Sequence, residues 1–289
     1  MPTNEQRRAT AKRKLERQLE NRAARARKRK QMTIAGSVLG VVVVVAAVTG
    51  VYFLTKGEDG ENNAAEPTPE ASLSAAPPPA AQPKPELVNC AYNDGAPAAK
   101  PVQKPARTEG IPTTGGDSTV SVSVETSQGP IGLTLNNAES PCTVNSFVSL
   151  ASQGFFDGVA CHRMTADEYL KVLQCGDPTG QGNGGPGYTF ADEYPTDQYA
   201  PNAPELQQPI SYARGTLAMA NAGPATNGSQ FFLVYGDSQL PPNYTIFGTV
   251  DENSLSTLDK IAEIGQDNAN GPGDGAPNQP VVLESVRLD

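Results

Sequence analysis

The sequence predicts a mainly β domain, an antiparallel barrel capped by two helices, carried on a linker behind one transmembrane helix. Short strand patterns recur throughout residues 118–289, and only two helical patterns interrupt them. Residues 55–117 are rich in proline, alanine and small polar residues and poor in the large apolar side chains that form a core. Residues 34–54 contain no charged residue. These observations divide the chain into an arm (1–33), a span, a linker and a domain.

The uncharged segment is long enough to cross a bilayer. Its 21 residues rise about 1.5 Å each in a helix and so span the ~30 Å hydrocarbon core. A cleaved signal peptide is the alternative, but its apolar core is usually only about 7–15 residues long, and no clear A-x-A cleavage site follows here. Residues 1–30 hold 12 Lys and Arg against three Glu, which favours a cytoplasmic N-terminus. We expect a single-pass cell-membrane protein with an extracytoplasmic domain.

The basic arm also has the composition of a nucleic-acid-binding or lipid-binding tail, because RRATAKRKLERQLENRAARARKRK is rich in Lys, Arg and helix-forming residues. A topology signal with weak attraction to anionic headgroups explains the same charge without a further partner. No specific nucleic-acid partner is therefore expected.

The linker is expected to be extended and disordered, because stretches such as EPTPEASLSAAPPPAAQPKPE lack the apolar residues for a core. One feature interrupts this composition. The stretch LVNCAYNDG contains Cys90, which suggests a point where the linker is pinned to the domain.

Residues 118–289 have the size of one domain. TVSVSVETSQGPIGLTLN alternates apolar and polar residues on both sides of Gln128-Gly129-Pro130, which predicts a hairpin. GTLAMANAG, SQFFLVYG, YTIFGTV and VVLESVRL predict further strands. One helix is predicted from Ser140-Pro141, as an N-cap followed by proline, to Gly154, and a second from Ser254 to Gly265.

The cysteines indicate an oxidising compartment, because their number is even and all lie in the part expected outside. Two disulfides can be formed, with three connectivities open, among Cys90, Cys142, Cys161 and Cys175. A metal site is not expected, because the chain has no C-x-x-C pair and a single histidine.

Nucleophilic catalysis is poorly supported. His162 is the only histidine, and Cys161 beside it in a strand would point to the opposite face, so the two cannot form a dyad. We interpret His162 as a hydrogen-bonded core residue. The glycine-rich GQGNGGPG lacks the Lys-Ser/Thr of a phosphate loop and precedes no helical pattern. A hydrolase would lack a base.

Four stretches in this chain order, FFDGVACHRM (155–164), GDPTGQGNGGPGYTFADE (176–193), AMANAGPATNGSQFFLVYG (218–236) and YTIFGTV (244–250), resemble the cyclophilin family of peptidyl-prolyl cis-trans isomerases. The similarity covers nearly all of residues 118–289. It implies a closed eight-stranded antiparallel barrel capped by two α-helices and an enzyme that isomerises X-Pro bonds of proline-containing polypeptides without a cofactor.

The resemblance also assigns site residues. It implies that Arg163 hydrogen-bonds the substrate carbonyl near the prolyl nitrogen, that Gln174 binds the same backbone, and that Asn221 belongs with them. The implied substrate-binding residues, which form the proline pocket and the peptide groove, are Val172, Gly182, Ala220, Ala222, Gln230, Phe232, Leu240 and Tyr244. Cys161 and Cys175 lie on segments that the family joins as a hairpin, which implies one disulfide there and leaves Cys90 for Cys142.

The chain departs from the family in three places. Its loop between Arg163 and Gln174, MTADEYLKVL, is longer than the family's, and Tyr169, Leu170 and Lys171 compete for the place of an aromatic pocket residue. Tyr244 replaces a usual His. In the family, a Trp whose indole N–H donates a hydrogen bond to cyclosporin contributes much of the drug's affinity; Gln239 replaces it here, which implies weakened cyclosporin binding.

Two functions remain open at this stage. The first is an isomerase that accelerates the folding of exported proteins at the outer face of the membrane. The alternative is a proline-peptide binding module or chaperone with the same fold and little turnover, because the pocket floor is altered.

Overall fold

The computed structural model describes residues 75–289, so the predicted basic arm, membrane span and first part of the linker lie outside the described residues. Within 75–289, none of the helices has both the length and the apolar character to cross a membrane.

The α-helices of this part are α2 (Pro141–Ser152) and α3 (Leu255–Ile264). Short 3-10 turns are η1 (Gly115–Asp117), η2 (Thr196–Gln198), η3 (Pro204–Gln207) and η4 (Glu252–Ser254). The strands are β1 (Leu87–Val88), β2 (Asn93–Asp94), β3 (Ile111–Pro112), β4 (Thr119–Thr126), β5 (Ile131–Asn136), β6 (Val159–Ala160), β7 (Arg163–Thr165), β8 (Lys171–Cys175), β9 (Tyr188–Thr189), β10 (Ile210–Tyr212), β11 (Thr216–Met219), β12 (Phe231–Gly236), β13 (Ser238–Leu240), β14 (Ile246–Val250), β15 (Asp274–Gly275) and β16 (Val282–Leu288).

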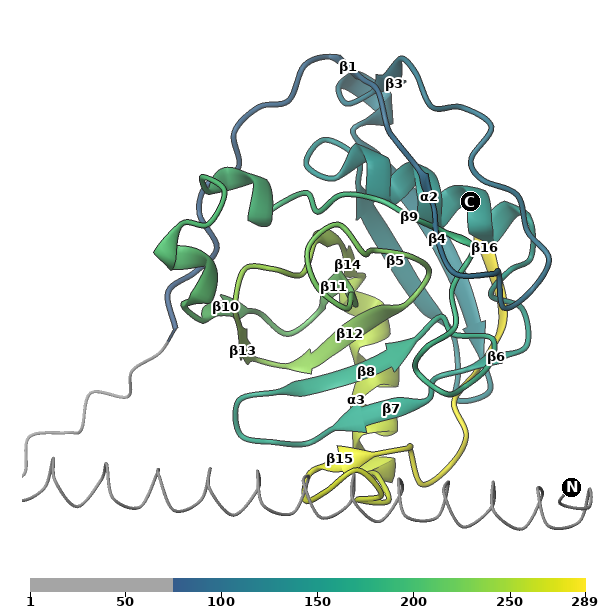
Figure 1. Cartoon of the computed structure of the whole chain (residues 1–289). Helices are drawn as coiled ribbons and strands as arrows, with labels where there is room; N and C mark the ends of the chain where they lie inside the picture. Colours follow the sequence, from purple (N-terminus) through teal and green to yellow (C-terminus); the bar gives the residue numbers. More distant parts are fainter. Residues whose placement is uncertain (1–74) are drawn as a thin grey trace, which may run out of the picture. The chain divides into compact units, whose positions relative to one another are not determined.

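Ten strands form one curled antiparallel sheet in the order β15-β7-β8-β12-β11-β14-β5-β4-β16-β6 (Figure 1). The predicted mainly β fold with two helices is confirmed. The predicted closed eight-stranded barrel is wrong, because the described sheet is an open half-barrel. Its two edge strands, β15 and β6, are two residues long and each pairs on one side only, so the edges do not meet. Short edge strands of this kind present few unpaired backbone groups.

The first hairpin follows from its sequence pattern. In β4 every second residue is buried towards its end, and β5 alternates buried and half-buried side chains along its whole length. The two strands pair from Thr119 with Asn136 to Val124 with Ile131. Gly129 in the connecting turn has a φ of 123°, which a residue without a Cβ adopts readily. The prediction of a hairpin about Gln128-Gly129-Pro130 is confirmed.

Helix α2 packs against β16, β5 and β14 and inserts Phe147 into the core, where its ring stacks on Phe156 at 4.9 Å between centroids. Ser140 occupies the N-cap position and Pro141 the first turn, as predicted, but the Ser140 hydroxyl donates to the carbonyl of Ile246 instead of capping the helix. The buried carboxylate of Glu193 accepts the N–H groups of Cys142 and Thr143 in its place. Helix α3 ends at Gly265, whose φ is 72°.

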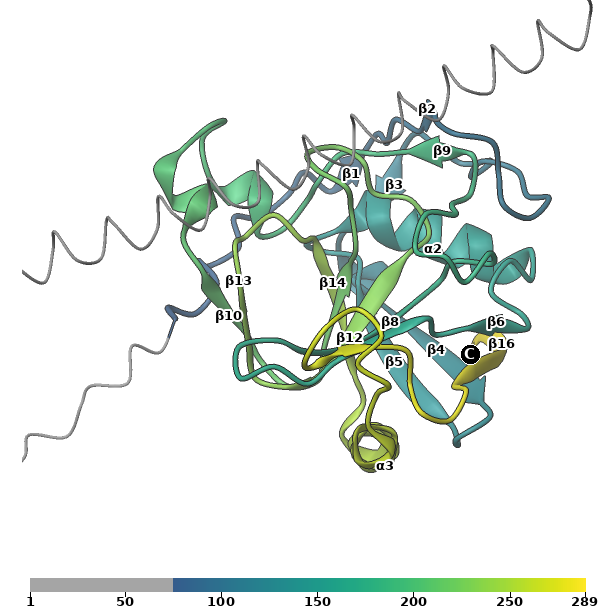
Figure 2. The same ribbon diagram turned by 60° about the horizontal axis from the view of Figure 1, so that its bottom comes forward.

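Residues 75–117, named here the strap, pack on the domain although a disordered linker was expected. Strand β1 pairs with β3 inside the strap, and β2 pairs with β9, as Figure 2 shows along one side of the molecule. A disulfide joins Cys90 to Cys142 on α2 with Cα atoms 5.3 Å apart. The pinning point suggested by Cys90 is therefore present. The strap belongs to the same compact unit as residues 118–289, because backbone pairing and the disulfide compensate for its few apolar side chains.

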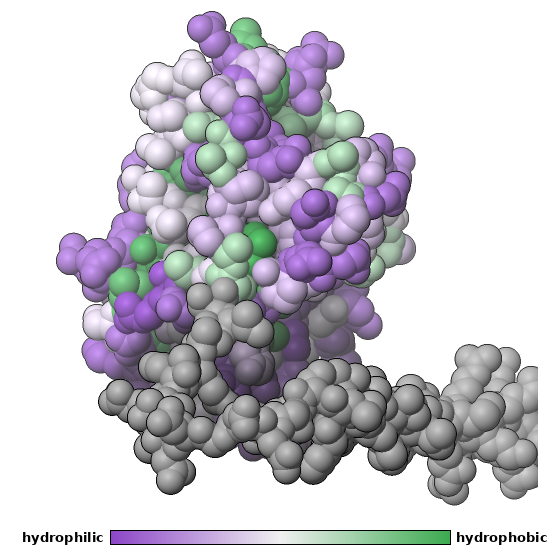
Figure 3. Space-filling view, turned by 90° about the vertical axis from the view of Figure 1, so that its left-hand side faces the viewer, coloured by the Kyte–Doolittle hydropathy of each residue, from purple (hydrophilic) through white to green (hydrophobic). Residues whose placement is uncertain are grey.

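The core lies between the concave side of the sheet and the helices. A group of phenylalanines in edge-to-face and stacked pairs fills its centre, with ring centroids 4.9–5.7 Å apart: Phe147, Phe155, Phe156, Phe231 and Phe247. On the face shown in Figure 3, apolar residues are scattered among polar ones and form no broad patch outside the grey atoms. Burial of this core drives folding. The site described below lies on the other side of the sheet, where a second, smaller apolar cluster includes Val172 and Phe232.

Candidate active site

The strand register places the key side chains in one row across the sheet. Arg163 on β7 is opposite Gln174 on β8, and Gln174 is opposite Phe232 on β12. Cross-strand neighbours on one face have Cβ atoms about 5 Å apart, so residues distant in sequence become adjacent. The row therefore runs from a cation through an amide to an aromatic ring.

A disulfide fastens the hairpin that carries two of these residues. Cys161 precedes Arg163 by two residues and Cys175 follows Gln174 directly, and the structure joins the two cysteines with Cα atoms 4.0 Å apart. Both implied disulfides, Cys161–Cys175 and Cys90–Cys142, are confirmed, and none of the described cysteines is free. The polar end of the row is thus held by a covalent link.

The row borders a small pocket of about 170 Å³. Its lining brings together most of the residues predicted for the site, namely Arg163, Val172, Gln174, Ala220, Asn221, Phe232, Leu240 and Tyr244, with Leu170 in addition. The Phe232 ring is buried and meets the Tyr244 ring edge-on, with centroids 5.8 Å apart. Such a cavity can hold a proline ring against its apolar wall, with the carbonyl of the substrate beside the guanidinium of Arg163.

Leu170 takes the place that the sequence left open. It packs with Val172 and Phe232 in a second apolar cluster, apart from the main core. Tyr169 is 53% exposed, and the stem of Lys171 lies against Gly236. The floor on this side is therefore aliphatic.

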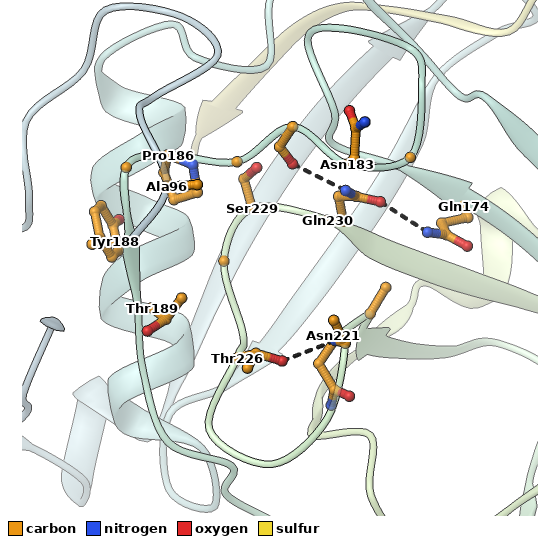
Figure 4. Close-up of a pocket in the computed structure, with 17 residues that line it drawn as sticks. Ala96, Gln174, Asn183, Pro186, Tyr188, Thr189, Asn221, Thr226, Ser229 and Gln230 are labelled. Carbon is orange, nitrogen blue, oxygen red and sulfur yellow. Dashed lines mark hydrogen bonds between the residues drawn. The ribbon is translucent and has the colours of Figure 1, made fainter. Parts of the chain in front are cut away.

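A second pocket of about 310 Å³ adjoins the first, since Gln174, Ala220 and Asn221 line both. The other predicted residues, Gly182, Ala222 and Gln230, lie here. Figure 4 shows the Gln230 side chain between two partners: it accepts from Gln174 at 2.9 Å and donates to the Gly184 carbonyl at 3.0 Å. The shared lining residues show that the two pockets adjoin and form one groove.

Asn221 is oriented at the junction of the pockets by its own side-chain bonds. Its amide N–H donates to the carbonyl of Asn243 at 2.7 Å, and its side-chain oxygen accepts the N–H of Gly223 at 3.2 Å. One amide N–H and the oxygen of this side chain are thus engaged within the protein.

Comparison with known proteins identifies the family. The family model described as "Cyclophilin type peptidyl-prolyl cis-trans isomerase/CLD" matches residues 121–288. The chain belongs to this family. "Probable peptidyl-prolyl cis-trans isomerase B" of Mycobacterium leprae (strain TN) is 56% identical over 303 residues, which cover 100% of both chains. The protein of the same name from Mycobacterium tuberculosis (strain ATCC 25618 / H37Rv) is 56% identical over 297 residues, covering 100% of this chain and 95% of the relative.

A solved structure, described as a Cryptosporidium parvum cyclophilin type peptidyl-prolyl cis-trans isomerase, aligns with a TM-score of 0.47 and 27% identity over 59% of this chain and 98% of its own. The family membership and the full-length relatives establish the activity of the chain. This cyclophilin is a peptidyl-prolyl cis-trans isomerase, an enzyme that interconverts the isomers of X-Pro bonds.

Among the residues that line the two pockets of this cyclophilin, Arg163 is the one with a charged side chain. Its ion pair with Asp274 raises the pKa of Arg163 and lowers that of Asp274.

Burial lowers the pKa of His162, against a smaller opposing effect of Asp177, and neither ring nitrogen has a hydrogen-bond partner. His162 is therefore neutral at pH 7. Its expected hydrogen bond in the core is absent, and its ring lies against Gly182, 3.6 Å from the point where a Cβ would stand.

No cluster of metal-ligating side chains occurs among residues 75–289. The arrangement at Arg163 can bind, orient and polarise a peptide bond. Two residues of the site, Ala96 and Asp274, lie outside the sequence motifs. Ala96 of the strap lines the second pocket, and Asp274 holds Arg163. Neither residue lies in a periodic pattern or a motif of the sequence. Their place in the site depends on contacts with residues far away in the sequence.

Proposed function

We propose that Arg163 is the catalytic residue of this isomerase and acts by favouring the twisted X-Pro bond. The observation that carries the proposal is the pocket that places the Arg163 guanidinium on one wall and the Phe232 ring on another. The proline ring lies against Phe232, Leu240, Val172 and Leu170, and the substrate carbonyl faces Arg163. Gln174 orients both the guanidinium and the bound backbone, because it contacts Arg163 at 3.3 Å and Gln230 at 2.9 Å.

The physical basis is differential binding. Partial double-bond character gives the peptide bond a rotation barrier of roughly 18–20 kcal/mol. As the bond twists, the lone pair on the prolyl nitrogen leaves conjugation and becomes a hydrogen-bond acceptor. A guanidinium N–H that reaches this nitrogen stabilises the twisted state more than either planar state. Each ~1.4 kcal/mol gained in this way raises the rate about tenfold, so a few donors suffice without a nucleophile.

We further infer that the enzyme works on exported polypeptides at the outer face of the cell membrane. The expected span at 34–54 and the basic residues before it support this location. Two disulfides in residues 75–289 support an oxidising compartment. The domain would then meet unfolded chains as they emerge, when X-Pro isomerisation limits folding over tens to hundreds of seconds.

A peptide assay and a topology assay test these two statements separately. Full-length protein in membranes should isomerise a proline peptide, and Arg163→Ala should abolish most of this activity while leaving peptide binding measurable by calorimetry. Protease added to intact cells stripped of their wall should digest the domain. A domain protected until the membrane is lysed would overturn the location and leave the catalytic role standing.

The alternative of a proline-peptide binding module with little turnover is not supported, because the family and the full-length relatives named as isomerases indicate an enzyme. The aliphatic pocket floor at Leu170 is therefore treated as a variation within an active site.

A further inference from the structure

Arg163 lies between partners on both neighbouring strands. Gln174 is its register partner on β8. On the other side, Asp274 of β15 is opposite Thr165, which is two residues further along β7. Because alternate residues of a strand point to the same face, Asp274 and Arg163 are diagonal neighbours on one face.

The contact between them is a two-pronged ion pair. The Nε of Arg163 donates to Asp274 Oδ1 at 2.9 Å, and its Nη2 donates to Oδ2 at 2.6 Å. Such parallel bonds fix the plane of a guanidinium as well as its position. An arginine has five N–H bonds, and this pair occupies one on Nε and one on Nη2. Gln174 accepts one from Nη1 at 3.3 Å, so one N–H remains free on each terminal nitrogen.

We infer that Asp274 is a positioning residue for isomerisation, which holds the Arg163 guanidinium side-on so that its two free terminal N–H bonds face the proline pocket. The inference rests on the proposed catalytic role of Arg163. A single free arginine side chain samples many rotamers, whereas a twisted peptide bond needs donors at defined points. Asp274 removes that freedom before the substrate binds.

The loop that carries Asp274 is itself held in shape. The Asp267 side chain accepts the N–H groups of Ala269 and Ala276, and the Asn268 side chain accepts that of Gly273. Gly275 allows this fold, because a Cβ there would lie 2.1 Å from the Asp267 carboxylate. The carboxylate of Asp274 therefore presents a fixed acceptor to Arg163.

The ion pair contributes more to geometry than to stability. The side chains of Arg163 and Asp274 are 35% and 27% exposed, and pairs that solvent reaches typically add little to the free energy of unfolding. Loss of the pair should therefore lower turnover without unfolding the domain. This separation gives the inference a test that a purely structural role would fail.

The experiment measures kcat and KM of the full-length chain with a proline peptide for Asp274→Asn, Arg163→Ala and the double variant. Asp274→Asn is expected to lower kcat about tenfold and to leave KM within about twofold, because the lost contact acts in the twisted state. In the Arg163→Ala background it should change nothing further. Asp259→Asn is the control, since it breaks the surface ion pair in which Nη2 of Arg214 donates to both oxygens of Asp259, and it should leave kcat unchanged.

Each outcome has one meaning. If Arg163→Ala keeps full activity, the proposed catalytic role is wrong. If Arg163→Ala is inactive while Asp274→Asn keeps the wild-type kcat, only the positioning inference is overturned. If Asp274→Asn lowers kcat by the same factor in the wild-type protein and in the Arg163→Ala variant, the inference is also overturned. Such a result would indicate that Asp274 acts through the structure of the domain and not through Arg163. Should Asp274→Asn fail to fold, Asp274→Glu keeps the charge but displaces the guanidinium, and it must lower kcat at unchanged KM.

Discussion

Cys90 of the strap is bonded to Cys142 near the start of helix α2, across 52 residues of sequence. The strap continues from Cys90 along β9 and reaches the second pocket at Ala96, where the Gly95 N–H donates to the Gly187 carbonyl at 3.0 Å. One covalent link thus connects the helix, the strap and the wall of the groove.

Loss of the Cys90–Cys142 disulfide should mainly affect stability, and loss of the Cys161–Cys175 disulfide should mainly affect kcat. In the chain-entropy account, a loop of 52 residues stabilises by about 4 kcal/mol and one of 14 residues by about 3 kcal/mol. Replacing Cys90 and Cys142 by Ser should therefore lower the free energy of unfolding more than replacing Cys161 and Cys175. The second pair fastens the strands of Arg163 and Gln174, so its loss should lower kcat more. Denaturant titration and the peptide assay on both double variants check this. The reverse ranking in the peptide assay would contradict the assigned role of the hairpin.

The strap should influence which peptides the enzyme accepts. Ala96→Trp places a large ring at the second pocket, so kcat/KM should fall about tenfold for peptides with a bulky residue flanking the proline. Peptides with alanine at the flanking position should be affected less. Ala91→Trp is the control, because it adds the same exposed ring to the strap but lines neither pocket. Equal effects of the two variants would show that Ala96 does not border the substrate.

Local pattern explains why much of the fold was predictable. The β4–β5 hairpin, both helices and their limiting residues follow from alternation, helical spacing and Gly or Pro signals that act within a few residues. The site residues were found through motifs, and eight of them line one pocket. The positions of Arg163 and Phe232 relative to each other follow from strand register.

What escaped prediction depends on contacts between distant segments. The strap has the composition of a linker, and only pairing with β9 and the bond to Cys142 give it structure. Asp274 lies in the turn sequence GPGDGAP, 111 residues from Arg163, so no local signal marks it. Barrel closure likewise depends on whether two edge strands meet, and β6 and β15 do not.

Arg163→Lys should lose most isomerase activity although it keeps the positive charge. A lysine ammonium sits on a flexible stem and lacks the planar fork, so it cannot bind Asp274 by two bonds and present two further donors in a fixed plane. We expect kcat to fall at least about tenfold with a smaller change in KM. Steady-state kinetics with the proline peptide measure both. A lysine variant that turns over at the wild-type rate would show that charge alone is sufficient.

The stability of the domain should fall in acid through His162. Burial lowers the folded-state pKa of His162 below its ordinary value of 6.5, with Asp177 opposing and Arg163 reinforcing the shift. Between the folded pKa and 6.5 the unfolded chain binds more protons, so the free energy of unfolding rises with pH in this window. The contribution is complete above 6.5 and is lost as the pH falls through the folded pKa. Denaturant titrations over this range should show a slope that His162→Gln reduces. Identical slopes for the two proteins would contradict the assignment.

Cyclosporin should inhibit this enzyme weakly, because the chain contains no Trp and Gln239 stands where the drug is expected to receive an indole hydrogen bond. Gln239 lies on β13 next to the pocket residue Leu240, and its backbone N–H is engaged with the Tyr169 carbonyl at 2.8 Å. The side chain offers an amide donor but little flat apolar area. Loss of such a bond and surface should cost about 1.5–3 kcal/mol, or roughly tenfold to a hundredfold in affinity.

Peptide turnover should suffer far less than drug binding, because the proline pocket is built on the side of Arg163 and Phe232. Gln239→Trp should therefore restore part of the cyclosporin affinity and leave kcat/KM for a proline peptide nearly unchanged. Ala91→Trp, which places a Trp on the strap away from the pocket, should restore none. Calorimetric titration of the three proteins measures the affinities directly. Nanomolar binding by the unmodified enzyme would mean that the rim at Gln239 does not set drug affinity, and the aliphatic floor at Leu170 would then be sufficient for the drug as well as for proline.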